Sequence, residues 1–94
     1  MVACNDKVAI GAAQALERHG LRVPEDVSLV GCGNLDAGQC FRPAISSVDQ
    51  KPQEMGNACV EMLLERIEDP KAPLREQRIW PELIVRKSTA AWVR

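Results

Sequence analysis

Asparagine and glycine residues stand at two points where predicted strands end. Asn5 follows an apolar segment at residues 1–4, and Gly31, Gly33 and Asn34 follow the apolar run at 27–30. An asparagine side chain offers both donors and an acceptor, which suits sugar hydroxyls or the edge of a base. Ligands of open α/β sheets bind beyond the carboxyl ends of the strands. The two loops are therefore candidate binding segments, although Asn5 also suits a helix cap and the glycine pair suits a plain turn.

The sequence shows no set of residues typical of an enzyme. It has one histidine, no serine in a nucleophile elbow and no glycine-rich phosphate loop. The segment at 31–34 lacks the third glycine and the following helix of a dinucleotide fingerprint. Four carboxylates fall at turns or helix starts, where caps and solvated charges are expected. They are Asp6, Glu25, Asp26 and Asp36. We therefore predict no catalytic residue, no cofactor and no enzymatic activity.

The four cysteines do not indicate a metal site. They are Cys4, Cys32, Cys40 and Cys59, and none forms a CxxC pair. A zinc site usually needs close ligand pairs, so no metal is expected. No apolar run reaches the roughly 20 residues that span a bilayer, and no secretory signal precedes the first helix. The expected location is the cytoplasm, where the thiols stay reduced and serve as small buried apolar residues.

Length and charge restrict the function further. The chain has 94 residues, a net charge of −1 and 3% aromatic residues. This length allows one small domain, and the low aromatic content suggests a piece of a larger one. A protein that binds nucleic acid by itself usually carries a clear basic excess. The local enrichment at Arg75, Arg78, Arg86 and Lys87 is interpreted as a solvated face.

The first half of the chain has the pattern of a βαβ unit. Apolar residues at helical spacing predict a helix over residues 6–19, with Asn5 or Asp6 as its cap and Gly20 just past its end. Residues 1–4 are interpreted as the end of one strand and 27–30 as a second strand, buried on both faces. The two strands should be parallel. Residues 44–49 are a further candidate strand.

The second half predicts one long helix and two short strands. Pro52 opens a helix over residues 52–67, where its missing N–H has no cost. Two adjacent apolar rows on this helix predict a wide buried face. Residues 77–80 and 83–86 are predicted strands separated by Pro81.

Ile10 lies on the polar side of the first helix, as an incidental apolar residue or as part of a subunit contact.

These segments, taken in order, resemble the LacI/GalR family of bacterial repressors. The resemblance rests on NDKVAIGA at residues 5–12, GLRVPEDVSLVG at 20–31, RPAISSV at 42–48, Met55 with Gly56, and PELIVRKST at 81–89. It covers about residues 1–90 and leaves 91–94 as a tail, so it is more specific than any single motif.

The resemblance implies an α/β, periplasmic-binding-protein-like (type I) fold, in which two lobes of parallel sheet flanked by helices enclose a small-molecule cleft. Residues up to about Phe41 would lie in one lobe, the helix at 52–67 in the other, and 83–87 in the first again. The family's helix-turn-helix is absent from these residues. Binding to operator DNA would therefore require a segment that this chain lacks.

The resemblance also assigns site residues. Asn5 matches an asparagine that commonly hydrogen-bonds the effector. Gly33 aligns with an aspartate that often binds sugar hydroxyls, so this chain lacks that carboxylate. Three explanations remain open: the effector differs from a simple sugar, Asn34 substitutes in part, or sensing has been lost. The family dimerises through its first helix and the loop near Phe41. This implies a symmetric homodimer interface containing Ile10, Gln14, Glu17, Cys40 and Phe41.

The leading hypothesis is therefore a module that senses a small, sugar-like effector for a LacI-family regulator. Two alternatives remain. One is a truncated chain that retains only dimerisation. The other is a relative of the periplasmic sugar-binding proteins, which share the fold.

Overall fold

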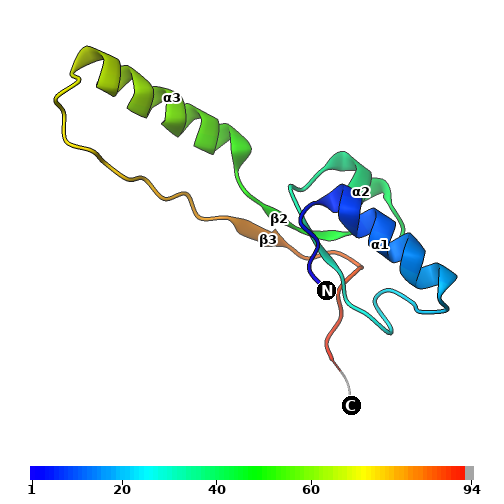
Figure 1. Ribbon diagram of the computed structural model, residues 1–94. Helices are drawn as coiled ribbons and strands as arrows, with labels where there is room; N and C mark the ends of the chain where they lie inside the picture. The colour runs from blue at the N-terminus through cyan, green and yellow to red at the C-terminus, as the bar shows by residue number, and fades with distance from the viewer. Residues whose placement is uncertain (93–94) are drawn as a thin grey trace.

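Three helices and a three-stranded sheet make up the described residues, 1–92, of the computed structural model (Figure 1). In chain order the elements are α1 (Asp6–Arg18), β1 (Val30–Cys32), α2 (Asp36–Cys40), β2 (Ser46–Asp49), α3 (Pro52–Glu68) and β3 (Glu82–Ile84). We call residues 1–49 and 82–92 the body, and α3 with residues 69–81 the arm. In Figure 1 the arm extends away from the body, so the molecule measures 59 × 26 × 17 Å.

Helix α1 begins and ends as the sequence predicts. The side chain of Asn5 accepts a hydrogen bond from the backbone N–H of Val8 at 2.8 Å, which makes Asn5 the N-cap. Gly20 lies just beyond the helix with φ of 77°, a conformation that glycine adopts without a steric penalty. Between these ends, Ala9 and Ala13 face the sheet and are buried.

The sheet has the order β1-β2-β3. Strands β1 and β2 are parallel, with Val30 opposite Ser46, whereas β2 and β3 are antiparallel, with Val48 opposite Leu83. Val2 forms a parallel bridge with Val30, which confirms that the segment before α1 lies beside β1 in the same direction. The β2 strand falls within the predicted range of 44–49. A short helix, α2, occupies what the sequence suggested was a plain loop.

Strand β1 lies later in the chain than predicted, at 30–32 rather than 27–30. The reason is that the C-terminal segment inserts between the two parallel strands where they begin. Leu29 donates its N–H to the carbonyl of Ser88 at 2.9 Å, and Ser88 donates its own N–H to the carbonyl of Ala44 at 2.9 Å. The hydroxyl of Ser88 donates to the Leu29 carbonyl and accepts from the N–H of Ser46. Ser88 is fully buried, so it acts as a wedge between β1 and β2.

Replacing Ser88 with alanine is expected to lower the free energy of unfolding by about 2 kcal/mol. The substitution leaves the N–H of Ser46 without a partner in a buried position, and an unsatisfied buried group costs roughly 1–3 kcal/mol. Urea denaturation measures the difference. Ser28→Ala is the matched control, since Ser28 is only half-buried and its partner, Ala90, is exposed. Equal losses in the two variants would contradict the wedge.

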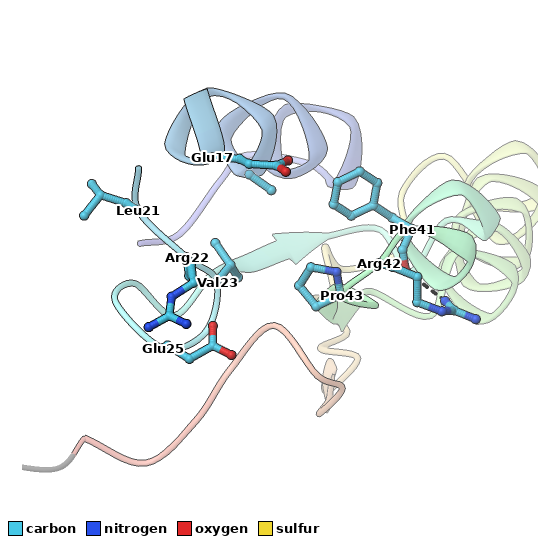
Figure 2. A pocket seen from close by; sticks show the side chains of 9 residues that line it. Glu17, Leu21, Arg22, Val23, Glu25, Phe41, Arg42 and Pro43 are labelled. Atoms are coloured by element: carbon cyan, nitrogen blue, oxygen red, sulfur yellow. Dashed lines mark hydrogen bonds between the residues drawn. The ribbon is translucent and has the colours of Figure 1, made fainter. Parts of the chain in front are cut away.

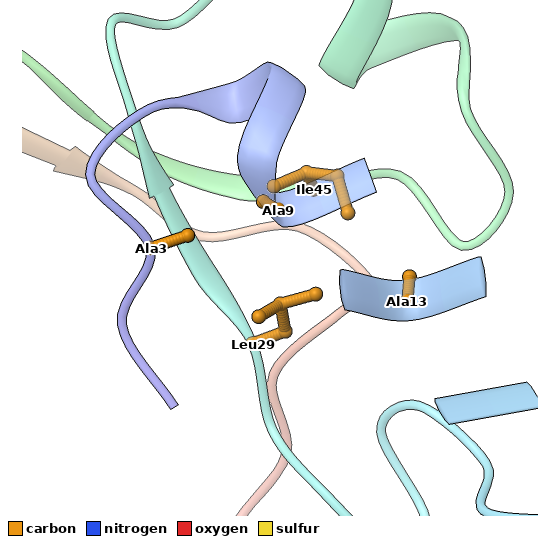
Figure 3. Packing of buried hydrophobic residues seen from close by; sticks show 5 residues of the cluster. All are labelled: Ala3, Ala9, Ala13, Leu29 and Ile45. Atoms are coloured by element: carbon orange, nitrogen blue, oxygen red, sulfur yellow. The ribbon is translucent and has the colours of Figure 1, made fainter. Parts of the chain in front are cut away.

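The hydrophobic core is small and aliphatic. It contains Ala3, Ala9, Ala13, Leu29 and Ile45 (Figure 3). Phe41 and Ile10 pack against it and are partly buried. Three of the five core residues are alanines, so helix α1 approaches the sheet closely and little apolar area is buried per residue.

The prediction of a wide buried face on α3 is wrong for this chain. Only Ala58 is buried on that helix, while Leu63 and Ile67 are 58% and 65% exposed. Among the described residues, α3 has only its own return segment beside it, in the hollow lined by Met62 and Leu74. The predicted strand at 77–80 is also absent, and the strand predicted at 83–86 is shorter, at Glu82–Ile84. Residues 77–80 pair with no other strand because they lie on the return segment of the arm, and the chain rejoins the sheet only at β3 (Figure 1).

Candidate functional site

The two predicted binding loops lie at the same edge of the sheet. Asn5 follows the bridge at Val2, and Gly33 follows β1, which runs in the same direction. Parallel strands place their carboxyl ends at one edge, and we call this the carboxyl edge. The arm also leaves the body here, because α3 follows β2 directly (Figure 1). Asn5 is exposed and Asn34 is half-buried.

A buried carboxylate joins the two loops. Asp6 is fully buried, and its Oδ2 accepts a hydrogen bond from the backbone N–H of Leu35 at 2.6 Å. Its Oδ1 accepts from the hydroxyl of Ser47 on β2 at 2.7 Å. The Ser47 hydroxyl in turn accepts from the backbone N–H of Asn34 at 2.9 Å. The start of α1, strand β2 and the loop after β1 are thereby held in one arrangement.

The close packing around Asp6 explains two glycines. A Cβ built on Gly31 would overlap the Asp6 carboxylate and lie 3.1 Å from its Cα. A Cβ on Gly38 would lie 3.2 Å from Asp6 Oδ2. Both glycines are buried. They leave the space that the carboxylate occupies.

The loop after β1 adopts backbone conformations that limit which residues it can contain. Gly33 has φ of 111° and Asn34 has φ of 52°. A positive φ is disfavoured for most residues and is tolerated best by glycine and asparagine. Gly33 donates its N–H to the carbonyl of Val48 at 2.9 Å. Glycine at position 33 therefore suits the backbone conformation of this turn.

A guanidinium group holds the side chain of Asn34. Arg86 donates to the Asn34 Oδ1 at 2.5 Å and to the carbonyl of Ile45 at 2.8 Å. Arg86 follows β3, so it is brought to Asn34 from a segment 52 residues away in sequence. The interpretation of Arg86 as part of a solvated face is therefore wrong, since it is half-buried and hydrogen-bonded. The expectation of a solvated or capping carboxylate at Asp6 is also wrong, because Asp6 is buried between three elements.

The residues predicted for a subunit interface lie around the other end of α1. Glu17 and Phe41 line one cavity of about 250 Å³, together with Leu21, Val23 and Pro43 (Figure 2). Gln14 and Cys40 are exposed, while Ile10 and Phe41 are partly buried against the core. Helices α1 and α2 are in contact, so these five residues form one region. Neither Asn5 nor Asn34 lines this cavity, which is separate from the carboxyl edge.

The cysteines are free, as expected, but they are not buried apolar residues. Cys4, Cys40 and Cys59 are exposed and Cys32 is half-buried. Within residues 1–92, no group of three or more potential ligand side chains is arranged to hold a metal ion. In the same range, no helix combines the length and apolarity needed to cross a bilayer.

Comparison with known proteins places this geometry in a family. Residues 1–89 match the family described as the periplasmic binding protein-like domain. The chain belongs to that family. It is 38% identical over 85 residues to the HTH-type transcriptional repressor PurR of Pasteurella multocida, a match that covers 90% of this chain and 25% of the relative. The chain thus spans about a quarter of the length of the curated relatives it matches.

Solved structures of the family share the same arrangement. The lac repressor dimer bound to operator and an anti-inducer superposes with a TM-score of 0.85 at 32% identity, over 97% of this chain and 32% of that one. A LacI family regulator from Enterococcus faecium with bound ribose gives a TM-score of 0.81 at 34% identity, over 95% and 33%. The chain therefore belongs to the LacI family and has the fold of a portion of its periplasmic-binding-protein-like domain. This confirms both the family resemblance and the predicted fold class.

Sequence reasoning missed Asp6, Ser47 and Arg86 as determinants of the site. The signal for Asp6 was weak, because an aspartate after an N-cap asparagine is usually exposed. Gly31 within an apolar strand was the better indication, since such a glycine often marks a close approach of another segment. For Arg86 the sequence offered no signal, because its partners lie about 40 and 50 residues away.

Proposed function

We propose that this chain is the effector-sensing portion of a cytoplasmic LacI-family regulator, without enzymatic activity. Its effector, a sugar-like small molecule, binds at the carboxyl edge between Asn5 and the loop of Gly33 and Asn34. The observation that carries this proposal is the Asp6–Ser47–Asn34 chain of hydrogen bonds, which fixes the two loops relative to each other. The ribose bound to the Enterococcus faecium relative supports a sugar-like ligand.

The arm suggests how binding is transmitted. We assign α3 and residues 69–81 to the second lobe, joined to the body through the paired strands β2 and β3. A ligand at the carboxyl edge would contact both lobes and favour the closed arrangement. The parent protein would contact operator DNA through a helix-turn-helix beyond the region present here. In this scheme closure biases the dimer between states that bind the operator and states that do not.

The role of Asn5 can be separated from its role as a helix cap. Serine caps helices about as well as asparagine, so Asn5→Ser should change the free energy of unfolding by only a few tenths of a kcal/mol. The same variant loses the amide N–H donors. We expect it to bind the effector at least about fivefold more weakly, the value of roughly one hydrogen bond. An unchanged affinity at unchanged stability would remove Asn5 from the site.

The measurement is a titration of the ¹⁵N-labelled chain with pentoses, hexoses and their sugar acids. At least one compound should shift the resonances of Asn5, Gly33 and Asn34, and titration calorimetry then gives its affinity for the parent chain and Asn5→Ser. Asn57→Ser, on an exposed position of α3, is the control and should bind normally. Shifts scattered over the surface, or none at the carboxyl edge, would contradict the proposed function.

A second candidate function is dimerisation without sensing. It is favoured by the exposed Gln14 and Cys40 beside the cavity lined by Glu17 and Phe41. In both proposals the homodimer forms through this region, in a two-fold contact. Sedimentation equilibrium measures the dimer, and the titration separates the candidates. A dimer that responds to no compound in the panel would favour the second.

A further inference from the structure

The side-chain amide of Asn34 has a fixed orientation. The oxygen and the nitrogen of a side-chain amide have nearly the same shape, so which is which is assigned from their hydrogen-bond partners. The partner of Asn34 is the guanidinium of Arg86, which has donors only. The atom that faces Arg86 must therefore be the oxygen, so the NH₂ group points away from it. Among residues 1–92 this NH₂ group has no protein partner, and because no buried side-chain nitrogen or oxygen lacks a partner there, the group is not fully buried.

The side-chain amide of Asn5 likewise has its oxygen engaged within the fold. Its oxygen accepts the hydrogen bond from the N–H of Val8, a group that can only donate. The NH₂ group of Asn5 is therefore the free end, and the residue is exposed. The fold thus engages the oxygen of each asparagine, and the free end of each side chain is its NH₂ donor.

Acceptors at this edge are correspondingly scarce. Both oxygens of Asp6 are occupied and the residue is fully buried. Gly33 has no side chain. Asp49, at the end of β2, uses its Oδ1 to accept the N–H of Lys51, and its half-buried carboxylate keeps one further oxygen. The carboxylate of Asp36, exposed at the start of α2, is the remaining negative group of this loop.

The charge near Asn34 reinforces this arrangement. In the described part of the chain, Arg86 takes part in no ion pair, so no carboxylate is paired directly with the guanidinium that holds Asn34. A cation that binds the amide oxygen polarises the amide and strengthens its N–H donors. Lys7, in the first turn of α1, is exposed and likewise has no carboxylate partner there.

We infer that the effector carries an anionic acceptor, such as the carboxylate of a sugar acid, and that this group binds the NH₂ groups of Asn5 and Asn34. This inference rests on the proposed function and specifies the chemical class of its ligand. A neutral sugar presents hydroxyls, which need acceptors as well as donors to be satisfied. A carboxylate only accepts, and hydrogen bonds to an ionised acceptor are about twice as strong as neutral ones.

The test compares D-glucuronate with D-glucose, which share one ring and differ by a carboxylate in place of a hydroxymethyl group. Each is titrated into the ¹⁵N-labelled chain. We expect glucuronate to bind at least about tenfold more tightly and to shift the side-chain NH₂ resonances of Asn5 and Asn34. Because the ring is the same in both compounds, a preference of the site for another sugar ring weakens both affinities alike and leaves their ratio interpretable.

Asn34→Asp is the informative variant. Aspartate tolerates a positive φ and can still accept from Arg86, so the loop should be retained. Its outer oxygen replaces a donor by a charged acceptor, and the affinity for glucuronate should fall at least about tenfold relative to the parent chain. Gln77→Glu makes the same change in net charge on the exposed arm, five residues before β3, and should leave the affinity within about twofold.

The outcomes separate this inference from the function on which it rests. Glucose that binds as tightly as glucuronate, with shifts at Asn5 and Asn34, would overturn the anionic ligand but keep the sensing site. Loss of that glucose binding in Asp36→Asn would identify the acceptor used instead. Glucuronate binding with no shift at these amides would overturn the inference as well. If the wider panel of sugars also leaves the carboxyl edge unchanged, the proposed function fails with it.

Discussion

Replacing Gly31 with alanine is expected to remove a large part of the free energy of unfolding of the body. The added Cβ would overlap the Asp6 carboxylate and press on the Asp6 backbone, which is the start of helix α1. A flexible side-chain end could move aside, but here the neighbour is backbone and a carboxylate with two hydrogen bonds. Overpacking costs about 1–3 kcal/mol and the lost bonds add to it. We expect a loss of at least about 3 kcal/mol, which is a large fraction of a small domain's stability.

Gly11→Ala is the matched control for this prediction. Gly11 lies within α1, and a Cβ there would have no neighbour within 4 Å. Alanine is the better helix former, so this variant should be more stable by up to about 1 kcal/mol. Urea denaturation followed through the backbone amide signal of Ile45, a core residue, reports on the body alone. A Gly31→Ala chain as stable as the parent would show that α1 does not lie against β1 as described.

Removing the carboxylate of Asp6 should be nearly as damaging. In Asp6→Ala the hydroxyl proton of Ser47 and the N–H of Leu35 lose their acceptor in a buried or partly buried setting. Each unsatisfied group costs about 1–3 kcal/mol, so the expected loss is roughly 3–4 kcal/mol. The damage should be concentrated in the loop after β1, because Asn34 is held there through Ser47.

Two measurements distinguish this network from a general loss of charge. Asp36→Ala removes the same side chain from an exposed position in the first turn of α2 and should cost no more than about 0.5 kcal/mol. Native-state hydrogen exchange should show faster exchange at Asn34 and Leu35 in Asp6→Ala before the rest of the body is affected. If both aspartate variants lose similar stability, Asp6 has no special role in the fold.

Much of the body could be predicted from local sequence. The N-cap at Asn5, the glycine that ends α1, and Pro52 at the start of α3 are local signals, and the structure confirms each of them. The parallel pairing of residues 1–4 with β1 followed from strand, helix and strand in that order. The caps depend on neighbours a few residues away, and the parallel pairing depends on the order of consecutive elements, so local patterns describe both.

The remaining features depend on contacts distant in the sequence. Strand β1 is displaced because Ser88 satisfies the backbone of Leu29, and nothing near residue 29 indicates that. Asp6 is buried because Gly31 and Gly38 leave space for it. The apolar rows of α3 correctly indicate a helix that is suited to burial, but within residues 1–92 they remain largely exposed. The apolar pattern shows that this face of α3 is suited to burial, but it does not show whether residues 1–92 include a segment that covers it.

The insertion of Ser88 also determines when this protein can fold. Its partners, Leu29 just before β1 and Ser46 at the start of β2, lie about 40 to 60 residues earlier in the chain, with the whole arm between them and Ser88. A chain emerging from the ribosome therefore has its first helix and both parallel strands outside long before the residue that locks them together is made. Contacts of such long range slow folding. The sheet can close only after Ser88 has been made, and until then the edges of β1 and β2 are open to pairing with another chain.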